Sequence, residues 1–183
     1  MKPTEILKKE HQLVLNMLKV MDAIGLKLES GQTVDPDDLA DIIDFIRRFA
    51  DGCHHAKEEK LLFVELEKAG LPRHDGPVAV MLREHEEGRH YARNMDEALQ
   101  RLKNGDPSAA GTYAQNARGY IRLLANHIDK EDHVLFVMAD QRLDQDAQKR
   151  LVEGFERVER EETGPDVHEK FHALLSRLQA AYL

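Results

Sequence analysis

One eleven-residue motif occurs twice in this chain, at residues 54–64 and 127–137, and it strongly constrains the fold. Aligned on the first histidine, the two copies share the pattern H-x-x-K-E-[ED]-x-x-L-F-V. Each copy holds a His and a Glu four residues apart, and in a helix such residues lie one above the other on the same face. Two motif helices that face each other therefore bring four side chains to one metal site.

The segment before each motif is repeated as well. Asp35-Pro36 and Asp106-Pro107 are both typical helix starts, with an acidic N-cap residue followed by proline at the first helical position. Residues 35–64 and 106–137 therefore resemble one helical unit that is used twice.

Two further long helices are predicted by apolar residues at helical spacing, one from a Thr4 cap to about Ser30 and one that begins at Pro77. Because consecutive helices run antiparallel, the motif helices should run parallel at opposite corners of an up-down-up-down bundle. We therefore expect an all-α fold in a single domain. It comprises a four-helix bundle over residues 1–140 and two additional C-terminal helices, within residues 141–183, packed on the bundle.

The composition supports this fold class and excludes several functions. The 183 residues are 42% hydrophobic and 33% charged with few aromatics, which suits helices with long solvated faces. A net charge of −8 without any basic run argues against binding to nucleic acid or to an anionic membrane, and no apolar run is long enough to span one. The single Cys53 cannot form an intramolecular disulfide, so we expect a cytoplasmic protein. The oligomeric state stays open, with a homodimer as one option.

Histidines on the other two long helices lie at the same expected depth as the motifs. His11 is early in the first helix and His85 is in the earlier half of the third, so antiparallel neighbours bring all four clusters to one level. His90 follows His85 by five residues, a rotation of about 140° in a regular helix, and reaches the site only if the helix unwinds locally, as in a π-bulge. The predicted metal ligands are His11, His54, Glu58, His85, His90, His127 and Glu131.

His55 and Glu59 are also four residues apart, so the first copy alone leaves the register open. The second copy has Ile128 and Asp132 at these places, and we therefore take the preceding His–Glu pair as the ligands.

Three other residues are interpreted as structural. Cys53 continues an apolar helix face and is assigned to core packing. His168 and His172 are four residues apart, but they lie beyond the bundle and lack an acidic partner at matching spacing.

Four or five imidazoles with two carboxylates form a donor set that favours iron, with manganese and zinc as rivals. Glu58 and Glu131 can bridge two metal ions while the histidines complete them, which predicts two non-haem irons per chain. Ferritin-type sites are richer in carboxylate and use Glu-x-x-His pairs. Fewer anionic ligands suit reversible binding of a small diatomic molecule, or a redox change, better than iron throughput.

These residues resemble the hemerythrin-like, or HHE cation-binding, domains over residues 1–140, and the form H-x-x-K-E-E-x-x-L-F is specific to that family. The resemblance implies one ligand each from the first and third helices and a His–Glu pair from the second and fourth. By position these are His11, His85, His54 with Glu58, and His127 with Glu131.

The sequence departs from true hemerythrins at two places. Their third helix carries H-x-x-x-H, whereas Arg89 stands at the second position here, and their last helix carries an Asp five residues after the His, whereas Glu131 follows His127 by four. Both departures resemble the bacterial hemerythrin-like branch, whose members bind oxygen, sense iron or redox state, or handle nitric oxide and peroxide.

The sequence therefore predicts a di-iron protein that binds or senses oxygen or a related small ligand, a diatomic or a peroxide, without establishing that it is an enzyme. A di-iron enzyme that breaks down peroxide or handles nitric oxide is the alternative. A helical module with a structural metal would show no redox change, and a ferritin-like protein would take up bulk iron.

Overall fold

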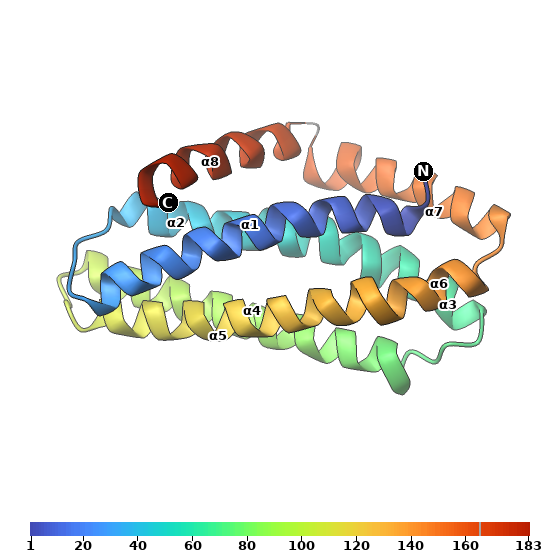
Figure 1. The fold of residues 1–183 in the computed structure, drawn as a ribbon, viewed down its shortest axis with the longest axis horizontal. Coiled ribbons are helices and arrows are strands. Elements are labelled where there is room, and N and C mark those ends of the chain that lie inside the picture. The colour runs from blue at the N-terminus through green and yellow to red at the C-terminus, as the bar shows by residue number, and fades with distance from the viewer. Residues whose placement is uncertain (165) are drawn as a thin grey trace.

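The computed structural model describes residues 1–164 and 166–183, and four long helical runs build its bundle (Figure 1). The first and third runs are single helices, α1 (Pro3–Glu29) and α4 (Gly76–Lys103). The second and fourth runs each change from α to π geometry near the motif and back again. The second run comprises α2 (Pro36–Phe45), η1 (Ile46–His55), η2 (Glu58–Leu62) and α3 (Phe63–Lys68). The fourth comprises α5 (Ala109–Lys130), η3 (Glu131–Leu135) and α6 (Phe136–Arg142).

The four runs alternate in direction, as predicted. α5 packs along both α4 and α1, while the second run packs against α1 and α4 from the other side, so the two motif runs lie at opposite corners. The expectation of an all-α, hemerythrin-like bundle with additional C-terminal helices is confirmed. No helix within the described residues is long and apolar enough to span a membrane.

Two local details differ from the sequence expectations, namely the N-cap of α1 and the location of π geometry. Lys2, and not Thr4, is the N-cap of α1, and the Thr4 hydroxyl donates to Asp140 across the bundle at 2.8 Å. The π geometry expected as an option near His90 lies instead in the motif runs, in η1 and at the equivalent segments η2 and η3. In both η2 and η3, the N–H of the motif phenylalanine, Phe63 or Phe136, bonds back five residues to a motif glutamate carbonyl.

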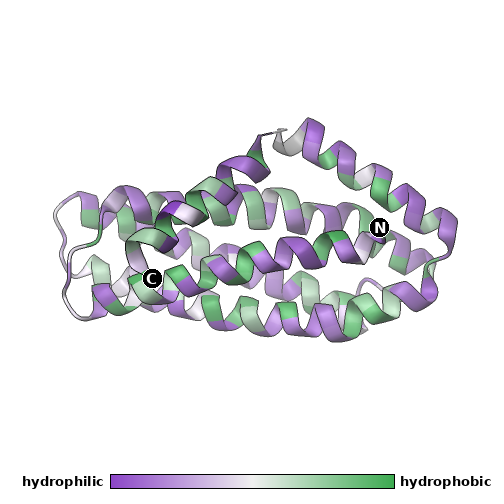
Figure 2. Ribbon diagram, turned by 45° about the horizontal axis from the view of Figure 1, so that its top comes forward, coloured by the Kyte–Doolittle hydropathy of each residue, from purple (hydrophilic) through white to green (hydrophobic). Residues whose placement is uncertain are grey.

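The apolar core forms two clusters, and the motif level lies between them. The larger cluster fills the end that holds the α1–α2 and α4–α5 connections, and the smaller one fills the end that holds α3 and α6. Hydrophobic and hydrophilic residues alternate along the helices (Figure 2), as expected for amphipathic helices around a shared core. The polar side chains between the clusters are therefore held by well-packed helices on both sides.

The C-terminal arm, defined as α7 (Gln145–Arg157), η4 (Val158–Thr163) and α8 (Val167–Tyr182), runs along one side of the bundle beside α1 and the second run (Figure 1). Phe171 of α8 is fully buried and packs edge-on against Phe45 and Phe49. Arg177 adds ion pairs to Asp38 and Asp41 of α2 at 2.6 and 2.7 Å. We propose that the arm and the bundle form one cooperative domain.

Replacing Phe171 with alanine tests this proposal. Loss of a fully buried phenylalanine should lower the free energy of unfolding by about 3–5 kcal/mol, and one transition should shift as a whole in urea, followed by circular dichroism. Val137→Ala, at a side chain that is 44% exposed, is the control and should change little. Two separate transitions, with only the weaker one shifted, would show that the arm is an independent unit.

Candidate metal centre

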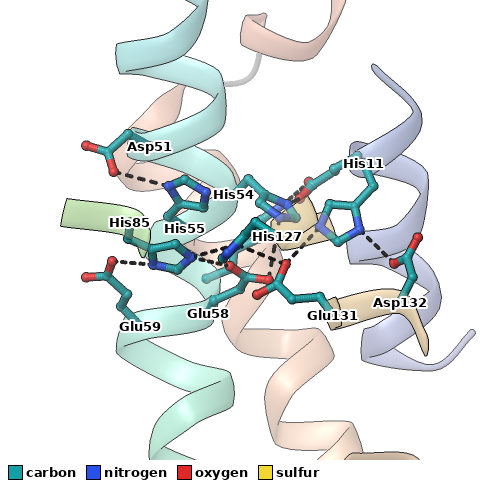
Figure 3. A network of polar contacts seen from close by, with 12 residues as sticks. His11, Asp51, His54, His55, Glu58, Glu59, His85, His127, Glu131 and Asp132 are labelled. Carbon is teal, nitrogen blue, oxygen red and sulfur yellow. Dashed lines mark hydrogen bonds and ion pairs between the residues drawn. The ribbon is translucent and has the colours of Figure 1, made fainter. Parts of the chain in front are cut away.

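Two groups of buried side chains meet at the centre of the bundle (Figure 3). One group is His11, His54, Glu58 and Glu131, and the other is His55, Glu58, His85 and His127. Within each group the potential ligand atoms lie within 4.8 Å of one another, and all seven residues are buried. Glu58 belongs to both groups, so its carboxylate lies where it can bridge two cations.

The imidazole Nε2 atoms face the two carboxylates at short range. His11 Nε2 lies 3.2 Å from Glu131 Oε2, and His127 Nε2 lies 3.3 Å from the same oxygen. His54 Nε2 and His85 Nε2 lie 3.5 and 3.3 Å from the two oxygens of Glu58. Each carboxylate is therefore shared by histidines from two different helices.

The polar atoms at this centre fit a bound cation. Within the described residues, the Nε2 atoms of His11 and His54 and all four carboxylate oxygens of Glu58 and Glu131 are buried and make no hydrogen bond. Leaving one buried polar group unsatisfied costs about 1–3 kcal/mol, and more if the group is charged. Nitrogen and oxygen donors in this number suit a divalent or trivalent transition metal, which would satisfy all of these atoms.

In four of these histidines, the ring nitrogen that faces away from the centre is held by an outer carboxylate. The Nδ1–H groups of His54 and His127 donate to Glu10 and Glu84, each at 2.9 Å. This bond fixes the tautomer that leaves Nε2 free as a ligand.

The same arrangement holds for the histidines of α1 and α4. The Nδ1–H groups of His11 and His85 donate to Asp132 and Glu59, each at 2.7 Å. Carboxylates that orient ligand imidazoles in this way are typical of metal sites.

These outer partners follow the internal repeat. The [ED] position of the motif holds Glu59 or Asp132, and a Glu-His dipeptide supplies both an outer carboxylate and a ligand on α1 and again on α4. The motif lysines complete the pattern, because Lys57 pairs with Glu10 and Lys130 pairs with Glu84. The two halves of the centre are thus related by an approximate two-fold repeat that extends beyond the ligands.

The structure brings six of the seven predicted ligands together and leaves His90 outside. α4 is a regular α-helix through this region, so the rotation of about 140° from His85 turns His90 to the surface, where it contacts Asn94 at 3.2 Å.

His55 lies inside the centre, although comparison with Ile128 had assigned it no ligand role. It lies at the end of η1, where the Ala56 N–H bonds to the Asp51 carbonyl five residues back. The adjacent His54 and His55 both face inward, as the equivalent residues His127 and Ile128 do in α5, so His55 places a polar ring where the second copy has an apolar side chain. The sequence signal for His55 was its place directly after His54, because two adjacent histidines can both be ligand candidates.

Burial and neighbouring charges together shift the pKa values of the central groups. Burial and the adjacent Glu131 carboxylate raise the pKa of Glu58 well above its ordinary value. Burial also acts to raise the pKa of Glu131, but His127 and His11 outweigh it and hold that pKa well below its ordinary value. Burial acts to lower the pKa of His127, yet Glu131 and Glu84 raise it to about 9. These shifts favour the protonated forms of Glu58 and His127, and a bound cation would compete with both protons.

The C-terminal arm adds groups to one half only. Lys57 is fully buried and bonds both Glu10 and, at 2.5 Å, Glu159 of η4. His168 of α8 lies 3.6 Å from each of these carboxylates and 3.8 Å from Cys53. His168 has no acidic partner at matching spacing on its own helix, as expected from the sequence, but Glu10 and Glu159 reach it from other helices.

The two motif lysines give a matched test of the difference between the half of the centre that the C-terminal arm covers and the half that it leaves open. Lys57→Met should destabilise the protein by about 3–5 kcal/mol, because it leaves the buried Glu10 carboxylate without its cation. Lys130→Met at the equivalent position should cost about 1 kcal/mol or less, since that side chain is 41% exposed. Urea unfolding of both variants, with metal content held equal, measures the difference, and equal losses would contradict the assignment.

An all-α bundle with a buried histidine–carboxylate centre defines a metal-binding helical protein. Residues 2–139 match the family model described as the hemerythrin HHE cation binding domain. This match covers most of the chain, and the chain belongs to that family. It therefore contains a cation-binding domain, and residues 140–183 lie outside the matched region.

The curated relatives come from mycobacteria. The chain is 28% identical over 132 residues to uncharacterized proteins of Mycobacterium bovis and Mycobacterium tuberculosis, covering 72% of this chain and 51% of theirs. It thus spans about half the length of the curated relatives it matches. No solved structure matches the chain.

Proposed function

We propose that the centre holds two non-haem iron ions and that the protein binds or senses oxygen or a related small molecule, such as nitric oxide or peroxide. The observation that supports this most is the shared position of Glu58 between two groups of buried ligands. One ion would be held by His11, His54 and the two glutamates, and the other by His55, His85, His127 and Glu58. Manganese and zinc are the rival metals, since they accept the same donors.

The chain would orient the imidazoles of such a centre, supply charged groups around them and exclude water. Bound iron would supply a reversible redox change and affinity for small ligands. The outer carboxylates hold the imidazoles in one tautomer and raise their basicity. Phe63 and Phe136 stack beside His85 and His11 at ring-centroid distances of 5.9 and 5.5 Å, which limits access of water to the ligands. These features suit selective binding of a small molecule in a protected site.

The first test is metal content and the optical spectrum of protein purified without added metal. We expect about two irons per chain and charge-transfer bands that change on exposure to air or peroxide. Sustained peroxide or nitric oxide consumption would favour the enzyme alternative over a binding or sensing protein. A folded, metal-free chain that stays colourless after anaerobic iron addition would refute the di-iron proposal, and a bound metal without redox change would indicate a structural role.

His55 and His90 provide a second test, since sequence and structure disagree about them. His55→Ile introduces the residue of the second copy and should lower the affinity for the second metal at least tenfold, because even outer-shell partners of a metal are worth about 10–100-fold. His90→Ala is the control and should leave affinity unchanged, since His90 is exposed and outside both groups. Metal titration of the two variants decides the assignment, and the reverse ranking would restore His90 as a ligand.

A further inference from the structure

The internal repeat is broken along one groove, between the second run and α4, next to His55 and His85. The repeat relates this groove to the one between the fourth run and α1. Small or polar side chains in the first groove stand where the second has large apolar ones. In each equivalent pair the residue of the first groove, between the second run and α4, is given before the residue of the second groove, between the fourth run and α1. The pairs are Gly88 and Val14, Arg89 and Leu15, Ala92 and Leu18, Asp51 and Leu124, and His55 and Ile128.

The result of these differences is a cavity on one side of the centre. In the second groove Val14, Leu18, Leu124 and Ile128 are all at most 5% exposed and belong to the main core cluster. In the first groove a cavity of about 170 Å³ remains, several times the roughly 30 Å³ that a water molecule occupies in the liquid. It is therefore large enough for a small polyatomic ligand.

The walls of the cavity connect the metal centre with the surface. His55 and His85 form its inner wall and are both buried, whereas Arg93 at the rim is exposed. Tyr120 from α5 also lines the cavity and is only 2% exposed. Gly88 lies directly beside this ring, since a Cβ built there would be in ordinary van der Waals contact with it at 3.5 Å.

The polar groups of the cavity favour an anion. Three arginines line it against one carboxylate, Asp51, in a chain whose net charge is −8, and one of them, Arg47, is paired with Asp96 at 2.8 Å. Arg89 is committed to Asp51 and Glu59 at 2.8 and 2.6 Å, and these carboxylates in turn contact His55 and His85.

Two donors remain available for a ligand. Arg93 forms no ion pair within the described residues, and the Tyr120 hydroxyl makes no hydrogen bond there. Burial raises the pKa of Tyr120 above its ordinary value, so its hydroxyl stays a donor. A guanidinium and a phenol around a small cavity match an anion of a few atoms.

We infer that this cavity binds a small inorganic anion of about three or four heavy atoms, beside the His55–His85 side of the metal centre. The inference rests on the proposed function, and it adds the charge class of the ligand and its point of entry. Arg93 and Tyr120 contact the anion, whereas Arg89 is a positioning residue that keeps Asp51 on His55 and Glu59 on His85. The opposite groove, filled by apolar side chains, binds no anion.

Azide is the probe, and iron-loaded protein is titrated with it at constant ionic strength while the optical spectrum is recorded. We expect saturable binding to the wild type. Ala92→Leu, which introduces the residue of the filled groove, and Arg93→Gln should each weaken azide affinity about tenfold, the effect of losing space or one charge-assisted hydrogen bond. Iron content and helical circular dichroism should stay unchanged in both.

Lys19→Gln is the matched control, because Lys19 stands at the position equivalent to Arg93 and the change in net charge is identical. Its azide affinity should equal that of the wild type within about twofold. Iron-loaded wild type that does not bind azide, or equal affinity in wild type, Ala92→Leu and Arg93→Gln, would overturn the cavity assignment and leave the di-iron proposal intact. Protein that takes up no iron would refute the proposed function and this inference with it.

Discussion

The structure depends on two carboxylates, Glu58 and Glu131, that are fully buried at the middle of a helical bundle. Two such groups close together repel one another, and the chain can hold them there only with compensating charge. Histidines from all four runs surround them, and a second layer of carboxylates and lysines surrounds the histidines. Apolar clusters above and below hold this polar layer in place. A bound cation would satisfy these central atoms together. The stability of the fold and the cation binding of the family therefore depend on the same buried groups.

The repeat in the sequence encodes more of this layer than the ligands. Its lysine and its acidic sixth position look like a solvated charge run, yet Lys57 is fully buried and Glu59 and Asp132 orient histidines of other helices. Each motif run thus orients the candidate ligand of a neighbouring helix and also supplies candidate ligands of its own. A repeat that supplies ligands and their supports together explains how similar surroundings arise at both halves of the centre.

The sequence was sufficient for the bundle and for six residues of the centre, because helical spacing and antiparallel order determine which side chains share a level. It was insufficient for His55. The equivalent pair His127 and Ile128 is buried in the regular helix α5 just as His54 and His55 are buried in η1, but the apolar Ile128 gave no sign that its counterpart is a potential donor. His90 is the converse case, since α4 stays regular and turns it outward. The acidic neighbours of His168 could not be predicted from helical spacing, because Glu10 and Glu159 lie far away in sequence.

The departures from two-fold symmetry give the two halves of the centre different surroundings. Beside His54, residues beyond the matched family region close over the site, where Glu159 completes the partners of Lys57 and Phe155 packs near its ammonium group. Beside His85, the groove keeps Gly88 and Ala92 and opens a cavity toward the surface. A chain with an exact repeat would offer two equivalent ions with equal access. Here one half is covered by the C-terminal arm and the other is lined by arginines. Under the proposed di-iron function, a ligand from solvent would therefore meet the His55–His85 side first, and side chains outside both donor groups would give the two ions separate tasks.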